Sequence, residues 1–147
     1  MTDSENDELR RPLGLTLLTG LYLFLFLVSA STFGNPFPFM GHIYLGTPAK
    51  ALVFADSLVC LYLFLGIMKR QLFTWYFLLG YNMFEICNTV LNLSFISMGD
   101  LERVIGEKVQ KDALWINNIA SALAILLLTQ YVYRHKNYFT NRRKYLF

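Results

Sequence analysis

Residues 12–33 read PLGLTLLTGLYLFLFLVSASTF and contain no charged side chain. An α-helix of about 20 apolar residues is long enough to cross the hydrocarbon core of a lipid bilayer. This stretch therefore predicts a transmembrane helix. The alternative of a cleaved signal peptide is disfavoured, because the apolar run is too long for one and the residues before it are acidic.

The composition of the whole chain supports a membrane protein. Of its 147 residues, 55% are hydrophobic and only 16% are charged, whereas about a quarter of the residues of soluble domains are charged. The mean hydropathy is +0.41, an apolar excess that one soluble core of this size cannot bury. This hydrophobicity excludes a disordered chain, and the presence of only two cysteines excludes a secreted disulfide scaffold.

Three further segments share this apolar character, and they are residues 47–68, 71–98 and 113–133. The segment 71–98 is longer than a bilayer requires, so we expect it to tilt or to protrude from the membrane. Together, the four segments predict an all-α integral membrane protein. Its residues 12–133 would form a single four-helix transmembrane bundle.

Lys and Arg residues lie on one side of the predicted membrane. Residues 1–11 are acidic and then basic, residues 69–70 are Lys-Arg, and the tail 134–147 holds five basic residues. The link 34–46 has no Lys or Arg, and four acidic residues offset the three basic ones of 99–112. Because cytoplasmic segments are enriched in Lys and Arg, we expect both termini in the cytoplasm. The protein would be a multi-pass membrane protein, located in the inner (plasma) membrane if it is bacterial.

The tail 134–147 combines basic residues with aromatic ones. Such a segment should lie on an anionic cytoplasmic leaflet, at about 1 kcal/mol per basic residue near the surface. We expect Arg142, Arg143 and Lys144 to contact anionic lipid, and we expect the tail not to specify the fold. Nucleic acid is not an expected partner, because the positive-inside bias already accounts for this charge.

Two carboxylates lie deep within the predicted spans, and such groups usually mark a function or a buried pairing. At 1.5 Å per helical residue, Asp56 and Glu85 fall at similar depths in the outer half of the membrane. Lys50 lies close enough to the outer surface for its side chain to reach water. We expect Glu85 to be neutral and to share its proton with Asp56 and nearby asparagine amides.

Asparagines accompany these carboxylates on the third and fourth spans. Asn82, Glu85, Thr89 and Asn92 lie on one helical face, which Asn88 borders. Polar residues of this kind either line a pocket or pack helices together, and both interpretations remain open. The predicted pocket residues are Asp56, Glu85, Asn88, Asn92 and Asn117, with Lys50 and His42 at the rim. No metal or cofactor is expected, because no second ligand lies at metal spacing from His42.

No catalytic motif accompanies these residues. The expected function is therefore that of a non-enzymatic accessory or assembly subunit, with a small ligand in the outer-half pocket. One alternative is a proton- or cation-linked transporter or channel that acts as an oligomer. Another is an intramembrane enzyme that uses Asp56 and Glu85 for acid–base chemistry. A homo-oligomer or a larger membrane complex is the expected assembly.

Overall fold

The computed structural model describes residues 11–146, so most of the predicted acidic and basic N-terminal segment lies outside the described residues. The described chain is mostly helical, as predicted. Its elements are α2 (Leu13–Ser31), β1 (Phe37–Phe39), β2 (His42–Tyr44), α3 (Gly46–Met68), α4 (Leu72–Phe95), α5 (Met98–Ile105), α6 (Lys111–Arg134) and the short 3-10 helix η1 (Lys136–Tyr138).

Within residues 11–146, three helices are long and apolar enough to cross a membrane, namely α2, α3 and α6. The fourth long helix, α4, carries Glu85 and the asparagines 82, 88 and 92, which lower its hydropathy. It ends at Phe95, before the predicted end at residue 98. There Ser97 starts α5 by accepting a hydrogen bond from the backbone N–H of Asp100 at 3.1 Å.

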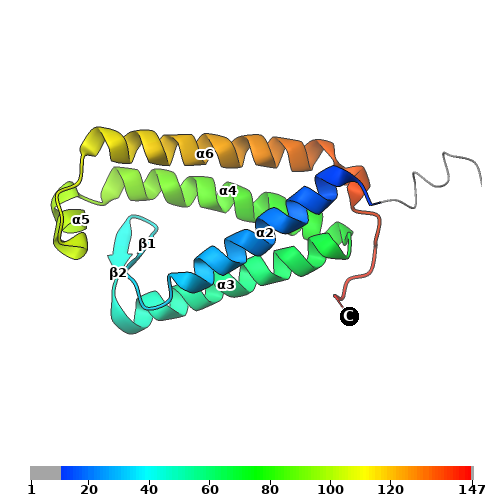
Figure 1. Ribbon diagram of the computed structural model, residues 1–147, viewed down its shortest axis with the longest axis horizontal. Coiled ribbons are helices and arrows are strands. Elements are labelled where there is room, and N and C mark those ends of the chain that lie inside the picture. Colours follow the sequence, from blue (N-terminus) through cyan, green and yellow to red (C-terminus); the bar gives the residue numbers. More distant parts are fainter. Residues whose placement is uncertain (1–10, 147) are drawn as a thin grey trace, which may run out of the picture.

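The four long helices form two packed pairs, α2 with α3 and α4 with α6 (Figure 1). The turn between α3 and α4 lies at one end of the molecule, with the start of α2 and the end of α6 (Figure 1). The strands and α5 lie at the opposite end. The two ends are called the turn end and the hairpin end below.

The main apolar core lies toward the turn end. Its buried residues include Leu15 and Leu18 of α2, Leu63 and Ile67 of α3, and Val132 of α6. Tyr22, Trp75, Leu78 and Phe139 complete this cluster. Because close packing is concentrated at one end, the space between the helix pairs is less completely filled toward the hairpin end, where the cavities described below lie.

The link 34–46 forms a β-hairpin at the hairpin end. Phe37 pairs with Tyr44 and Phe39 with His42 in an antiparallel register. Its tip is Met40-Gly41, and both residues have positive φ, 50° and 85°. A positive φ favours glycine, and a two-residue tip of this kind matches the right-handed twist of the flanking strands. The sequence did not reveal these strands, because Pro38 within β1 is atypical of a strand interior.

The tail does contribute to the fold, contrary to the expectation stated above. Phe139 is buried in the apolar core. Asn141 pairs with the α3–α4 turn: its carbonyl accepts from the N–H of Leu72 at 2.8 Å, and its N–H donates to the carbonyl of Arg70 at 2.9 Å. The Gln71 side chain donates to the carbonyl of Arg143 at 2.8 Å. Residues 138–143 therefore provide hydrogen-bond partners for backbone groups that the turn leaves unpaired. This segment is called the tail clasp below.

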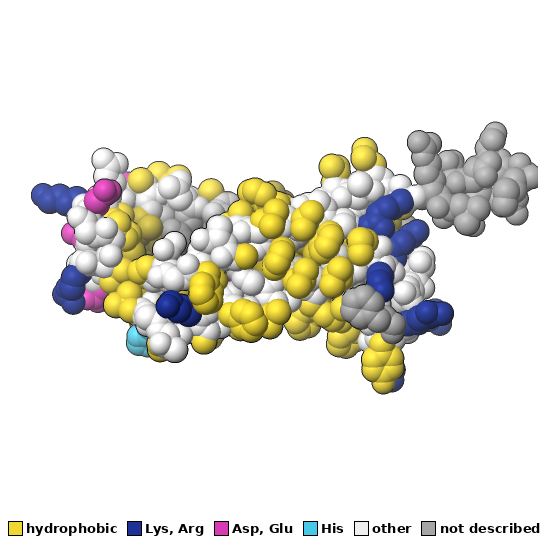
Figure 2. All heavy atoms as spheres, turned by 60° about the horizontal axis from the view of Figure 1, so that its bottom comes forward, with side chains coloured by type: hydrophobic (Ala, Val, Ile, Leu, Met, Phe, Trp, Pro, Cys, Tyr) yellow, Lys and Arg dark blue, Asp and Glu magenta, His cyan; other side chains and the backbone are white. Residues whose placement is uncertain are grey.

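Charged side chains gather at the two ends. On the face shown in Figure 2, apolar side chains cover the middle, and Lys and Arg cluster at each end. At the turn end, Arg11 donates to the carbonyl of Met68 at 2.8 Å, and partial burial and the neighbouring Arg70 lower the pKa of Arg11. Arg142, within the tail clasp, and Lys144, just after it, are exposed there.

Candidate functional site

Two cavities open between the helices around Asp56 and Glu85. The four-helix cavity, of about 280 Å³, is lined by residues of α2, α3, α4 and α6. The α3–α4 cavity, of about 380 Å³, is lined by residues of α3, α4 and the hairpin. Four residues line both cavities: Phe37, Asp56, Tyr81 and Glu85. The structure thus brings together the two carboxylates that the sequence placed at similar depth.

Asp56 is held in place by hydroxyl groups from two other helices. Its Oδ2 accepts a hydrogen bond from Ser29 Oγ of α2 at 2.6 Å. Its Oδ1 accepts from the Tyr81 hydroxyl of α4 at 2.7 Å. Both oxygens of this half-buried carboxyl group are therefore engaged, and Asp56 links α2, α3 and α4.

Glu85 has a different environment. It is half-buried and lines both cavities, but its carboxyl group makes no hydrogen bond to any other residue of 11–146. The expected hydrogen bonds to asparagines are not formed. Instead, Asn88 Oδ1 accepts from the N–H of Met40 and Asn92 Oδ1 from that of Gly41, both at 2.8 Å. These asparagines hold the hairpin against α4, and neither of them pairs with Glu85.

A second polar group in the four-helix cavity also lacks a partner. Asn82 is only 3% exposed, and its Oδ1 accepts a hydrogen bond from the Tyr22 hydroxyl at 2.6 Å. Its Nδ2 has no hydrogen-bond partner within the described residues. A buried donor left unpaired costs about 1–3 kcal/mol. A ligand that accepts from Asn82 Nδ2 would recover part of that cost.

The lining of both cavities is acidic and apolar. None of the residues lining either cavity is Lys, Arg or His. Lys50, a predicted rim residue, is exposed on α3 and belongs to neither lining. The ion pair between Asp100 and Arg103, at 3.4 Å, involves neither of the two carboxylates. A cationic group would therefore meet no competing positive charge.

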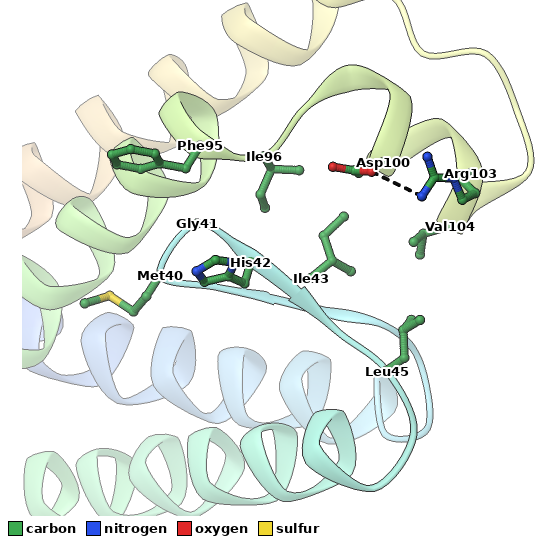
Figure 3. Close-up of a pocket in the computed structure, with 10 residues that line it drawn as sticks. All are labelled: Met40, Gly41, His42, Ile43, Leu45, Phe95, Ile96, Asp100, Arg103 and Val104. Carbon is green, nitrogen blue, oxygen red and sulfur yellow. Dashed lines mark ion pairs between the residues drawn. The ribbon is translucent and has the colours of Figure 1, made fainter.

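Of the remaining predicted pocket residues, only Asn88 lines one of these two cavities. Asn88 lines the α3–α4 cavity, but Asn92 lines a different space, next to α5 and α6. Asn117 is exposed on α6, where its backbone carbonyl accepts from Ser121 Oγ at 2.8 Å. His42 lines a cavity of about 600 Å³ between the hairpin and α5, together with Asp100 and Arg103 (Figure 3). The structure does not bring Asn92, Asn117 or His42 together with Glu85.

Sequence reasoning missed three contributors, Tyr22, Ser29 and Tyr81, and it placed Asn82 on the face of Glu85 without counting it among the pocket residues. Tyr81 lies one helical turn before Glu85, so helical periodicity could have assigned it to the same face, as it did Asn82. Tyr22 and Ser29 lie two turns apart on α2, which carries no acidic or basic residue that would mark it as part of a polar site. The hydroxyl-bearing side chains of α2 are the sequence feature that could have indicated its contribution to the site.

The described residues offer no ready metal centre. Within residues 11–146, no group of three or more His, Cys, Asp or Glu residues lies close enough together to hold a metal ion. Comparisons with protein-family models, with curated proteins and with solved structures find no match to this chain. Any assignment of function therefore depends on the chemistry of the site itself.

Proposed function

We propose that this protein is a multi-pass membrane protein, a four-helix transmembrane bundle that binds a small ligand beside Glu85. The three apolar helices support the membrane location. The fourth helix, α4, packs against α6 and presents its polar residues to the cavities. The gathering of Arg11, Lys69 and Arg70 with the tail at the turn end supports a cytoplasmic position for that end.

The proposed topology can be tested by cysteine labelling. In a variant without Cys60 and Cys87, we expect Asn35→Cys and Glu107→Cys to react with an impermeant maleimide added to intact cells. Both positions are exposed at the hairpin end, whereas Lys144→Cys at the turn end should react only after permeabilisation. The reverse labelling pattern would contradict the orientation.

Ligand binding is proposed from one observation. Glu85 and the Nδ2 of Asn82 have no hydrogen-bond partner among the described residues, and these two residues line the four-helix cavity. Buried polar groups in folded proteins are normally paired. A concave, mostly apolar space with a few converging polar groups is the usual form of a small-molecule site. Binding is therefore assigned to the four-helix cavity.

We expect a bulky side chain in this cavity to abolish binding. Ile125 is half-buried on α6 and lines the four-helix cavity, so the side chain of Ile125→Trp should occupy its space. Leu126→Trp adds a similar bulk at the next residue, which is 48% exposed and lines neither cavity. Titration calorimetry with phenoxyethanol, a neutral probe with a donor and an acceptor, should detect binding to wild type and Leu126→Trp only. Equal binding to both variants would place the site elsewhere.

We further propose a non-enzymatic, accessory role within a larger membrane assembly. The support comes from α6, because no residue in its most apolar segment is buried. Ile116 and Leu127, for example, are 65% and 66% exposed. A helix with one side on α4 and the other uncovered can pack against a second copy or a partner helix without disturbing the cavities.

A further inference from the structure

The hydrogen-bonding state of the two carboxyl groups restricts the ligand, given the ligand-binding function proposed above. Asp56 accepts two hydrogen bonds from within the protein, whereas Glu85 accepts none from residues 11–146. In its ionised form Glu85 can only accept hydrogen bonds, so a ligand group that pairs with it in that form must be a donor. A charged donor is favoured over a neutral one, because hydrogen bonds to ionised groups are stronger.

The surrounding charge also favours a cation. Asp56 lines the same cavity as Glu85, and no basic residue lines the four-helix cavity. A ligand carboxylate or phosphate would add negative charge next to these two groups. A protonated amine instead provides the opposite charge that a buried carboxylate requires.

The rest of the lining suits an apolar molecule. The aromatic rings of Tyr22, Phe37 and Tyr81 line the cavity, together with aliphatic residues such as Leu25 and Ile125. Aromatic faces attract organic cations at short range, and aliphatic side chains contact an apolar body. The lining therefore fits an ammonium group attached to a ring or a short hydrocarbon chain.

Asn82 adds an independent requirement. Its Nδ2 is a donor without a partner in the described part of the chain, in the same cavity as Glu85. Glu85 follows Asn82 by one helical turn, so both side chains lie on the same face of α4. A ligand that satisfies both groups must carry an acceptor oxygen close to its amine.

We propose that the four-helix cavity binds an apolar amine that also carries a hydrogen-bond acceptor. Glu85 is the counter-ion of the amine, and Asn82 donates to the acceptor. Asp56 is a positioning residue, because its bonds to Ser29 and Tyr81 hold the three helices around the cavity.

Three small probes test this assignment on the purified full-length protein in detergent. Phenoxyethylamine has both required groups, phenoxyethanol replaces its amine by a hydroxyl, and phenylpropylamine replaces its ether oxygen by a methylene. Titration calorimetry should show that phenoxyethylamine binds about tenfold or more tightly than phenoxyethanol, because a charge-assisted hydrogen bond is lost in the alcohol. It should bind about two- to tenfold more tightly than phenylpropylamine, which lacks the partner of Asn82.

Two variants connect these preferences to the named residues. Glu85→Gln keeps the shape of the side chain and should lower the affinity for phenoxyethylamine at least about tenfold while leaving phenoxyethanol nearly unchanged. Glu107→Gln, at an exposed residue of the hairpin end, is the matched control and should change neither affinity. Asn82→Leu should remove the difference between phenoxyethylamine and phenylpropylamine.

The outcomes separate this inference from the function on which it rests. If phenoxyethanol binds wild type as tightly as phenoxyethylamine does, the cavity still binds a small ligand, but selectivity for an amine is wrong. The same conclusion follows if Glu85→Gln leaves the affinity for the amine unchanged. If none of the three probes binds, both the amine assignment and the proposed function are overturned. Because the comparison of probes uses the wild-type protein, it remains decisive even if a variant fails to fold.

Discussion

Phe139→Ala is expected to lower the free energy of unfolding by about 3 kcal/mol, the usual cost of truncating a buried phenylalanine. Phe139 lies in the tail, yet it is only 4% exposed and belongs to the same core as Trp75 and Val132. Its loss would leave a cavity where the tail clasp meets the helices. Thermal unfolding of the purified protein in detergent, followed by circular dichroism, measures the effect.

Tyr145→Ala is the matched control for this prediction. Tyr145 is an aromatic residue of the same tail but is 81% exposed, so its removal should change the stability little. Both variants keep Arg142, Arg143 and Lys144, which are exposed and remain free to contact anionic lipid as the sequence predicted. Equal melting temperatures for the two variants would mean that the tail lies on the surface and does not support the fold.

Gly66→Ala is expected to destabilise the protein by about 1–3 kcal/mol through overpacking. Gly66 of α3 faces Thr74 of α4, and an added Cβ would lie 2.8 Å from the Thr74 Cβ. Thr74 is fully buried and donates to Gln71 Oε1 at 3.0 Å, so it cannot easily move away. The two helices would have to separate next to their turn, and a lower melting temperature would report this.

A second change shows whether the contact itself is responsible. Thr74→Gly removes the opposing side chain, so Gly66→Ala should cost less in that background than in wild type. Gly80→Ala is the control on α4, because an added Cβ there meets nothing within 4 Å. It should stabilise the helix by up to about 1 kcal/mol. If Gly66→Ala is as stable as Gly80→Ala, then α3 and α4 do not approach closely at this point.

The helices were predictable because their signal is local. An uncharged run such as 12–33 must be helical in a membrane, since only a helix satisfies its own backbone hydrogen bonds there. Each predicted span corresponds to one long helix, α2 over Leu13–Ser31 in this case. The shared position of Asp56 and Glu85 also followed from counting residues along two helices joined by a short turn.

The partners of polar side chains were not predictable in the same way. Asn88 and Asn92 lie on the face of α4 that the sequence marked as polar, but they bind the backbone of a hairpin whose strands carry no clear pattern. Ser29 engages Asp56 only because α2 packs against α3. Such contacts depend on tertiary packing, so helical periodicity alone could not assign an asparagine to the ligand or to the hairpin.

The tail clasp also has a consequence for biosynthesis. Residues 138–143 leave the ribosome after all four long helices, yet they supply the partners of the turn at Arg70 and Gln71. Until residues 138–143 have been synthesised, the backbone groups of this turn must therefore be satisfied by other partners such as water. The turn acquires its final partners only when α6 is in place, so closure of the clasp is a late step of maturation. An assembly interrupted before that step would keep its helices but expose this turn to cellular quality control.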